Sequence, residues 1–505
     1  MALNSSGPIS LGGATVGQSI NLELGQAATA LTSLNATNVR TLLQVPSGQI
    51  SLSNAYGKSS NSYWVVYLGI GKNQGNSRTD AVVNPDSLYV TNNGVSAIHL
   101  TYNGGSRAGS KFSYVGNDGT IVASADYGST AQFYMLTGNT NSSSNRYPLA
   151  YTNGGSNWLN VVDGTGSYTT LVYGNGGTVS PEQPLKIVNG CFASDNTYAN
   201  VGFSNRGKSG WYYRYTKYGA SGGATISLES LNGGSSYYAN GASPSLLVRS
   251  DNSYASVVIL NGGGYPTDAY YVPLTSSLVF NGGGNWTRVI ASGYTGSCIN
   301  LATNVVYSIF QNKIGVLNSS LTTCTLYEFS GRRTGQGPRM WGAAFYNGIV
   351  YFGCSYDNGG STQTTPSFTI CAWNTATQTF SWAKNIQLSG GQQYSPFFNF
   401  DTYNGTAIYA NSNGVFFACY GIDTYGGESF LFKFPLDGNI TNATYTNVGP
   451  SINLTISSQT MTVVGTTTSN TSSGLPSQQS KGSNSSITLT PTTLSNPTFT
   501  KTALT

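Results

Sequence analysis

Few side chains in this 505-residue sequence are of the kinds that catalyse reactions. It contains seventeen Asp and Glu residues and a single histidine, His99. A Ser-His-Asp triad would have to use His99, which lies in an apolar, strand-like stretch with no nucleophile motif beside it. Glycoside hydrolysis needs two carboxyl groups flanking the scissile bond, and no spacing singles out such a pair. The isolated acids that could serve are Glu182, Glu229, Glu328, Asp401, Asp423 and Glu428.

Two other patterns with a chemical meaning are incomplete. Segments starting at Ser124 and Ser355 match the first half of the Ser-x-Asp-x-Gly-x-Thr-Trp turn motif of sialidases, but both lack the tryptophan. The six cysteines lack the CxxC spacing of a zinc site and favour buried free thiols. We therefore expect no catalytic residues, no metal and no cofactor, and a protein that is not an enzyme. A polysaccharide depolymerase is the catalytic alternative.

Basic and aromatic residues gather in one segment. Residues 331–341 contain Arg332, Arg333 and Arg339 and end at Trp341. Guanidinium groups bind anionic oxygens in pairs, and an aromatic ring can stack on a ligand beside them. The segment therefore predicts a site for an anionic glycan. The alternatives are a solvated loop and a contact with another protein subunit.

The composition favours an all-β protein with an uncharged polar surface. Only 8% of the residues are charged, against roughly 25% in typical soluble domains. The 64 glycines and 35 tyrosines suit short strands joined by tight turns better than helices. A net charge of +5 without a basic stripe argues against a nucleic-acid partner. No apolar run is long enough to predict membrane insertion or a secretory signal.

Weak internal repeats indicate the architecture. Residues 195–201 and 251–257 share an Asp-Asn-x-Tyr-Ala phrase 56 positions apart, and residues 347–353 and 413–419 share an Asn-Gly turn followed by a strand. Asn-Gly-Gly occurs seven times and supplies the positive φ angles that hairpin turns need. The hairpin-bearing units are expected near residues 87–115, 131–173, 188–216, 245–274, 303–330, 342–374 and 400–438.

Repeats of this length, each able to form a four-stranded sheet, predict a β-propeller of about seven blades over residues 61–450. Six or eight blades are also compatible. We expect the strand at 63–69 to close the ring with the last blade. The alternatives are a stack of β-sandwiches and a β-helix, but β-helix rungs are shorter and sandwiches would not repeat the same turn phrase.

The first sixty residues carry a duplicated motif. The sequence Ser-Gly-x-Ile-Ser-Leu at residues 6–11 recurs at 47–52 and ends in Tyr-Gly-Lys-Ser at 56–59. Between the copies, residues 35–43 predict a helix, because a polar cap precedes apolar residues at helical spacing. A module of this size buries little surface, so we expect it to dock on a partner. The alternative is a simple cap on the large domain.

This motif resembles the N-terminal module of tailed-phage structural proteins, notably tail-fibre and baseplate-associated proteins of aquatic and cyanobacterial phages. The resemblance covers residues 1–60 and implies attachment to a virion, so the chain would be synthesised in the host cytoplasm and located in the phage tail. It implies an attachment surface formed by Ile9, Leu11, Ile50, Leu52, Tyr56 and Lys58.

The C-terminal residues 451–505 are rich in Ser and Thr and almost uncharged. We expect this segment to be extended, either disordered or ordered as strands on a partner chain. The expected partners of the whole protein are other tail or baseplate proteins, host cell-surface polysaccharide and, in a trimer, further copies of itself. The leading hypothesis is a tail-fibre adhesin, and an architectural virion protein is the alternative.

Overall fold

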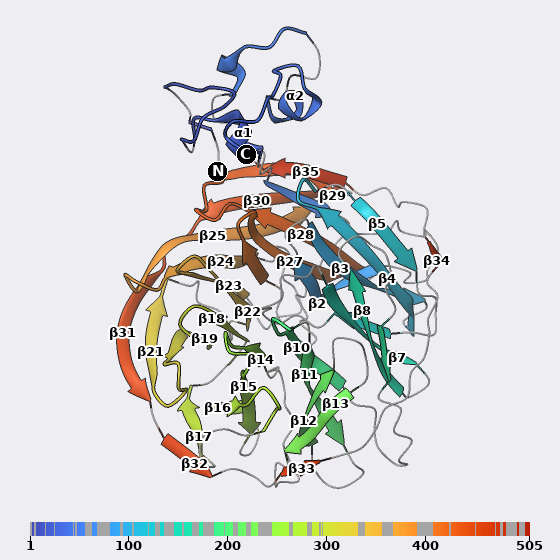
Figure 1. The fold of residues 1–505 in the computed structure, drawn as a ribbon, viewed down its shortest axis with the longest axis vertical. Coiled ribbons are helices and arrows are strands. Elements are labelled where there is room, and N and C mark those ends of the chain that lie inside the picture. Colours follow the sequence, from blue (N-terminus) through green and yellow to red (C-terminus); the bar gives the residue numbers. More distant parts are fainter. Residues whose placement is uncertain are drawn as a thin grey trace.

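The computed structural model describes an almost entirely β protein with a small helical lobe at its N-terminus (Figure 1). The described residues are 3–4, 7–15, 17–24, 26–43, 45, 48–55, 63–67, 81–90, 94–103, 106–119, 121–126, 132–135, 146–153, 156–163, 171–174, 186–195, 197–205, 211–218, 224–230, 245–261, 266–279, 285–291, 294, 296–331, 339–355, 367–390, 408–423, 426–449, 451–469, 471–474, 478–480, 492–493 and 500–504.

The described strands form seven antiparallel sheets, which are the blades of a β-propeller. Blade 1 contains β2 (Ala81–Val90), β3 (Gly94–Asn103), β4 (Ser106–Gly116) and β5 (Ile121–Asp126); blade 2 contains β6 (Gln132–Met135), β7 (Arg146–Asn153), β8 (Ser156–Asp163) and β9 (Leu171–Gly174); blade 3 contains β10 (Lys186–Phe192), β11 (Tyr198–Asn205), β12 (Trp211–Tyr218) and β13 (Ala224–Ser230). Blade 4 contains β14 (Ser245–Val248), β15 (Tyr254–Asn261), β16 (Pro266–Leu274) and β17 (Asn285–Ile290); blade 5 contains β18 (Gly296–Asn300), β19 (Val305–Ile309), β20 (Lys313–Leu317) and β21 (Cys324–Ser330); blade 6 contains β22 (Arg339–Tyr346), β23 (Ile349–Ser355), β24 (Ser367–Asn374) and β25 (Thr379–Gly390); blade 7 contains β26 (Ile408–Asn411), β27 (Gly414–Asp423), β28 (Gly426–Phe434) and β1 (Tyr63–Tyr67).

The seven-bladed propeller expected from the repeats is therefore confirmed. Two of the Asn-Gly-Gly phrases lie at two-residue hairpin connections, because Asn103 pairs with Ser106 and Asn153 pairs with Ser156. The glycines of these turns lie outside the described residues. The repeated Asp-Asn phrases form the turn between the first two strands of blades 3 and 4, where Asn252 adopts a positive φ of 62°.

The hydrophobic core lies between neighbouring blades. Four clusters of buried side chains join blades 3 to 4, 4 to 5, 5 to 6 and 6 to 7. Because blades stack face to face, both faces of an inner strand are covered, so β14 is buried at every residue and β19 at all but its first, rather than at alternate residues. Buried hydroxyl groups add polar links between blades: Tyr215 of blade 3 bonds to Ser256 of blade 4 at 2.9 Å.

The ring closes where the N-terminal strand joins the last blade. β1 pairs antiparallel with β28, from Trp64 opposite Lys433 to Tyr67 opposite Phe430, which confirms the predicted closing strand. Trp64 Nε1 and Lys433 Nζ both donate hydrogen bonds to the carbonyl oxygen of Asn117 in blade 1, at 3.0 and 2.9 Å. The junction between the first and last blades is therefore fixed by backbone pairing and by two buried side chains.

A second closure involves the C-terminal segment. Its strands add to the outer edges of the blades: β30 (Ile452–Ser458) to blade 6, β31 (Thr462–Ser469) to blade 5, β32 (Thr471–Gly474) to blade 4, β33 (Gln478–Ser480) to blade 3, β34 (Thr492–Thr493) to blade 1 and β35 (Thr500–Leu504) to blade 7. β29 (Ala443–Gly449) pairs with β30 as the outermost strand of blade 6. We call β30 to β35 the belt. Figure 1 shows β31, β32 and β33 at the rim, while β10, β14, β18 and β22 lie towards the middle.

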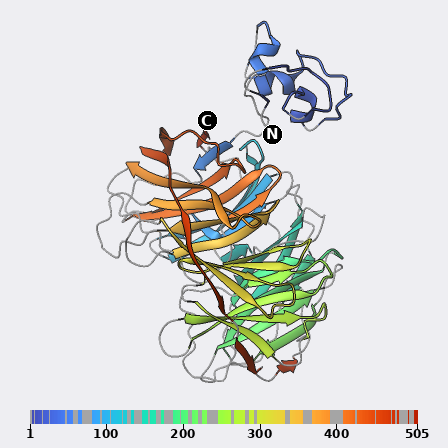
Figure 2. The same cartoon turned by 90° about the vertical axis from the view of Figure 1, so that its left-hand side faces the viewer.

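The belt travels around the ring against the order of the blades, through blades 6, 5, 4, 3, 1 and 7. Figure 2 shows it in orange to red, passing from the orange sheets across the outside of the yellow and green ones. The Ser/Thr-rich segment expected to be disordered or ordered by another chain is thus described as strands paired with the blades of its own chain. Its uncharged residues alternate between buried and half-buried in β30, as expected for an outer strand with one covered face.

Residues 3–55 form a separate N-terminal lobe, which lies outside the ring in both views (Figures 1 and 2). It contains α1 (Ile20–Glu23), α2 (Thr37–Leu43) and the 3-10 turn η1 (Leu52–Ala55), so the helix predicted at 35–43 is confirmed. Ser19 begins α1 by accepting a hydrogen bond from the Leu22 amide. The lobe has its own small core of Leu3, Ile20, Val39, Leu42, Leu43 and Ala55.

Candidate functional site

The predicted attachment residues occupy two different environments in the N-terminal lobe. Ile9, Leu11 and Ile50 are half-buried and pack against the lobe's own core. Leu52 begins η1 with 38% of its side chain exposed. Tyr56 and Lys58 lie outside the described residues. The two copies of the motif therefore both contribute to the interior of the lobe, and Leu52 is the described member that also faces solvent.

The most exposed apolar side chain of the lobe is Leu31, which sequence reasoning missed. It is fully exposed, on a loop tied down by hydrogen bonds from both sides. The buried Asn21 donates from Nδ2 to the carbonyl oxygen of Ala30 at 2.8 Å, and Thr32 Oγ1 donates to Gln26 Oε1 at 2.8 Å. No repeat or motif in the sequence marks Leu31 as a binding residue. Only the structure of its hydrogen-bonded loop shows that it is exposed.

The loop around Leu31 also packs closely on the segment after the first motif copy. The Gly13 amide donates to the carbonyl oxygen of Ala28 at 2.9 Å. A Cβ added at Gly12 would lie 2.8 Å from that same oxygen, so a larger residue would push the loop away. An apolar side chain held out on a rigid loop is a typical anchor of a protein interface, since little entropy is lost on binding.

The predicted glycan-binding segment joins blades 5 and 6. Arg332 and Arg333 lie outside the described residues. Arg339 and Trp341 belong to β22, the first strand of blade 6, where they pair with Ser355 and Gly353. Ser355 also pairs with Phe368, so the segment 331–339 and the connection between β23 and β24 leave the sheet at the same end. The strand ends at Arg339, Ser355 and Phe368 thus lie at one end of the sheet, and glycan binding by Arg339 and Trp341 stays a prediction.

The described acids considered for catalysis lie in three blades, and two of them lie on neighbouring strands of blade 7. Glu229 lies in β13 of blade 3, Glu328 in β21 of blade 5, and Asp423 and Glu428 in β27 and β28 of blade 7. Glu328 Oε1 accepts a hydrogen bond from Asn312 Nδ2 at 3.0 Å. Glu182 and Asp401 lie outside the described residues. His99 is in the middle of β3, paired with Val83 and Lys111, as expected for a strand histidine.

Two aspartates of the repeated phrase serve as turn formers. Asp251 accepts hydrogen bonds from the Ser253 amide and hydroxyl at 3.0 and 2.5 Å, and these bonds lower the pKa of its carboxyl group. Asp195 makes the same pair of bonds with Thr197. Asn252, next to Asp251, links blades 3 and 4, since its Oδ1 accepts hydrogen bonds from the amide and hydroxyl of Ser194 at 3.0 Å each. These polar side chains hold the fold together.

One further pattern has a chemical meaning. Residues 202–209 match GxxxxGK[ST], the phosphate-binding loop pattern, which requires a strand, a glycine-rich loop and a helix. In the structure, residues 202–205 end β11, and β12 returns antiparallel beside it from Trp211. The element described after the pattern is therefore the strand β12, where the motif requires a helix, so the match does not meet the requirements of a phosphate-binding loop.

Four of the six cysteines are free and buried, as the sequence indicated: Cys191, Cys298, Cys324 and Cys371. Burial raises the pKa of the Cys324 thiol to about 12 and raises that of Cys191 further. Within the described residues, no group of three or more His, Cys, Asp or Glu side chains could hold a metal ion. No helix in that same part of the chain is long and apolar enough to cross a membrane.

The fold defines the chain as a seven-bladed β-propeller with an N-terminal lobe and a C-terminal belt. No protein-family model matches it, and no curated protein matches it. Among solved structures, it is similar to the Dos1 propeller, with 11% identity over 68% of this chain and 76% of that chain and a TM-score of 0.35. It is also similar to the endosialidase of phage phi92, with 10% identity over 77% and 72% and a TM-score of 0.35.

A tail fibre of Staphylococcus aureus phage P68 is similar at 13% identity over 51% of this chain and 54% of that chain, with a TM-score of 0.23. Similarities this low assign no function. The class of fold is defined by the sheets themselves, and the function has to be argued from the lobe and the surface.

Proposed function

We propose that this chain is a tail-fibre or adhesin-type virion protein that attaches through its N-terminal lobe and presents the propeller to polysaccharide on a host surface. The observation that carries the proposal is the lobe itself. Residues 3–55 have their own core, and they hold Leu31 and Leu52 out in solvent. Together with the duplicated motif, this is the arrangement expected of a small docking module.

The polar surface supports binding as the role of the propeller. With 8% charged residues, the protein relies on Asn, Ser, Thr, Gly and Tyr for its contacts with water. Such side chains give hydrogen bonds and aromatic contact area without strong electrostatic steering. Weak contacts of this kind become effective when many copies on one particle engage a repetitive polymer, because the effective concentration of neighbouring sites is high.

The attachment half of the proposal is tested on particles assembled with variant chains. Leu31→Asp places a charge on the proposed anchor, whereas Val279→Asp makes the same change at a half-exposed valine in a turn of blade 4. Immunogold labelling against residues 61–450 should fall for Leu31→Asp and stay at the wild-type level for Val279→Asp. Equal labelling of both variants would remove the lobe from the attachment surface, and particles without label would overturn the virion assignment.

The binding half is tested with host cells. Label at distal tail appendages that becomes masked when cells are bound, and stays accessible when the cells are first oxidised with periodate, would support glycan recognition. Label confined to the neck, the baseplate interior or the capsid would instead make the protein architectural. Release of oligosaccharides from purified polysaccharide by the isolated protein would replace the adhesin with a depolymerase.

A further inference from the structure

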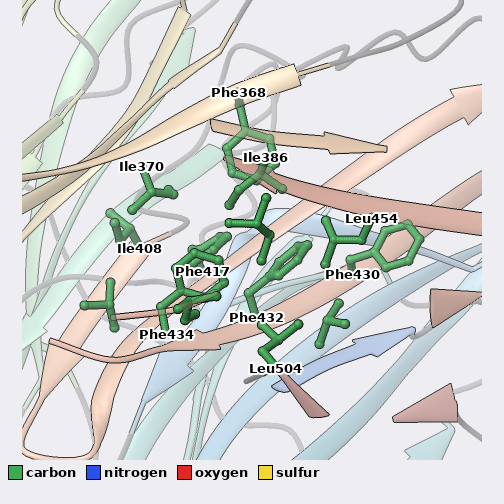
Figure 3. Close-up of a cluster of buried hydrophobic side chains, with 14 of the residues drawn as sticks. Phe368, Ile370, Ile386, Ile408, Phe417, Phe430, Phe432, Phe434, Leu454 and Leu504 are labelled. Carbon is green, nitrogen blue, oxygen red and sulfur yellow. The ribbon is translucent and has the colours of Figure 1, made fainter. Parts of the chain in front are cut away.

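The belt begins and ends in the same hydrophobic core. Ile452, Leu454 and Ile456 of β30 are buried in the cluster between blades 6 and 7. Leu504, at the end of β35, is 4% exposed and belongs to that same cluster. Figure 3 shows Leu454 and Leu504 around Phe430 and Phe432 of blade 7. The chain therefore leaves this core, passes around the rim and returns to it.

The start of the belt is also fixed by a buried lysine. Lys384 of β25 donates from Nζ to the Ile440 carbonyl oxygen, Asn442 Oδ1 and Ser458 Oγ, at 3.0, 2.9 and 3.3 Å. Its burial lowers the pKa of the amine. Gln459, which follows Ser458, donates its backbone N–H to the Ala383 carbonyl oxygen at 3.0 Å. These bonds join blade 6, the connection before the belt and the belt itself at one point.

The middle of the belt is held differently. β31 pairs along the full length of β21, but half of its residues are Thr and most of them are exposed. β32 and β33 add only short ladders, on blades 4 and 3. Each short strand contributes a few backbone hydrogen bonds, which are modest in net free energy. If the middle detaches while both ends stay anchored, the chain gains little conformational entropy. Release of the belt is therefore controlled by its two ends.

We infer that the belt is a circumferential lock, fastened in the core between blades 6 and 7, and that its release limits the rate at which the ring unfolds. Neighbouring blades meet through side-chain packing, and the belt adds a covalent chain across several of their boundaries. Blades can separate only after the belt has left their edges. Unfolding should therefore begin at the fastening, while blades 3 to 5 are still intact.

Two leucines of similar burial distinguish this order. Leu504→Ala weakens the fastening, and Leu247→Ala makes the same change in β14 of blade 4, where the side chain is 2% exposed. When the contacts of a buried leucine are lost before the transition state of unfolding, a Leu→Ala change raises the unfolding rate by roughly 30-fold or more. We expect that rise for Leu504→Ala and less than about threefold for Leu247→Ala, because blade 4 is still folded in the transition state. Leu247→Ala unfolding as fast as Leu504→Ala, or faster, would overturn the lock.

A disulfide staple gives an independent measurement on the full chain. A Cβ at Gly465 would lie 3.9 Å from the Cβ of Glu328, within the range that a disulfide spans. In the double variant Glu328→Cys/Gly465→Cys, oxidation should slow unfolding in guanidinium at least tenfold relative to the same protein kept reduced. Equal rates in the two redox states would mean that the belt leaves blade 5 after the barrier, which contradicts the inference. The single variants under oxidising conditions control for pairing with the native thiols.

Discussion

Lys433 offers a quantitative test of how the ring is closed. Its side chain is fully buried between blades 7 and 1, with Nζ 2.9 Å from the Asn117 carbonyl oxygen and 5.9 Å from the centre of the Phe416 ring. Burial lowers the pKa of Lys433 from 10.5 to about 8, Asp118 opposes this change, and Lys501 of the belt adds to it. Burial of the charged ammonium group therefore destabilises the folded state.

The size of that destabilisation follows from the difference between the two pKa values. Because the pKa is about 8 in the folded state and 10.5 in the unfolded state, charging this amine lowers the free energy of unfolding by about 3 kcal/mol at pH values below 8. Between pH 8 and 10.5 the folded state has released this proton while the unfolded state still holds it, so the contribution of Lys433 to stability rises with pH. Lys433→Met removes this dependence, together with a hydrogen bond of about 1 kcal/mol.

We therefore expect Lys433→Met to be more stable than the wild type at pH 7 by about 2 kcal/mol, and slightly less stable at pH 10.5. Guanidinium unfolding of both proteins across this range measures the gap, and only the difference matters because buried tyrosines titrate in both. Trp64→Phe is the control, since it removes the other donor to the Asn117 carbonyl without removing a titrating group. A gap between wild type and Lys433→Met that stays constant within about 1 kcal/mol would refute the reasoning.

Three further changes test other parts of the fold. Gly331→Ala should destabilise the protein by several kcal/mol more than Gly348→Ala in thermal melts. Both glycines have positive φ, so the backbone strain of the substitution is common to both. The new Cβ at 331 would lie 2.1 Å from the Thr460 carbonyl oxygen, whereas the one at 348 meets nothing within 4 Å. Tyr215→Phe should cost about 1 to 2 kcal/mol in chemical denaturation, because the buried Ser256 hydroxyl loses its partner across the blade boundary. Thiol reagents at pH 8 should leave the buried cysteines unmodified until denaturant is added, since burial blocks access and holds them protonated; rapid labelling of the native protein at these positions would contradict their placement. The thiols in question are Cys191, Cys298, Cys324 and Cys371.

The blades could be predicted because their turns use specific chemistry. The Asp-Asn phrases recur since each builds the same hydrogen-bonded turn, with Asn252 at positive φ and Asp251 bonded to Ser253. The closing strand at 63–67 was recognisable as an isolated apolar run that needed a buried place. Both signals are local, so one sequence was enough to find them.

The belt could not be assigned to its partner strands in the same way. Its ladders are formed by backbone groups that every residue carries, and Thr-rich strands such as β31 have no side-chain pattern that selects β21 over another edge. The lobe shows a similar limit. The Ile-Ser-Leu alternation indicates which side chains of Ile9, Leu11 and Ile50 are covered, but not that the lobe itself covers them.

The position of β1 has a mechanical consequence. The lobe connects to the ring through this strand, and β1 lies between β28, with four paired residues, and β35, with five. If the lobe is the tether proposed above, tension between a particle and its host enters the propeller at Tyr63. A pull along the axis of β1 stretches the hydrogen bonds on both of its edges at the same time, in shear, so they must fail together. The last strand of the belt thus gives the strand that carries the lobe a second row of backbone hydrogen bonds against force applied along the axis of β1.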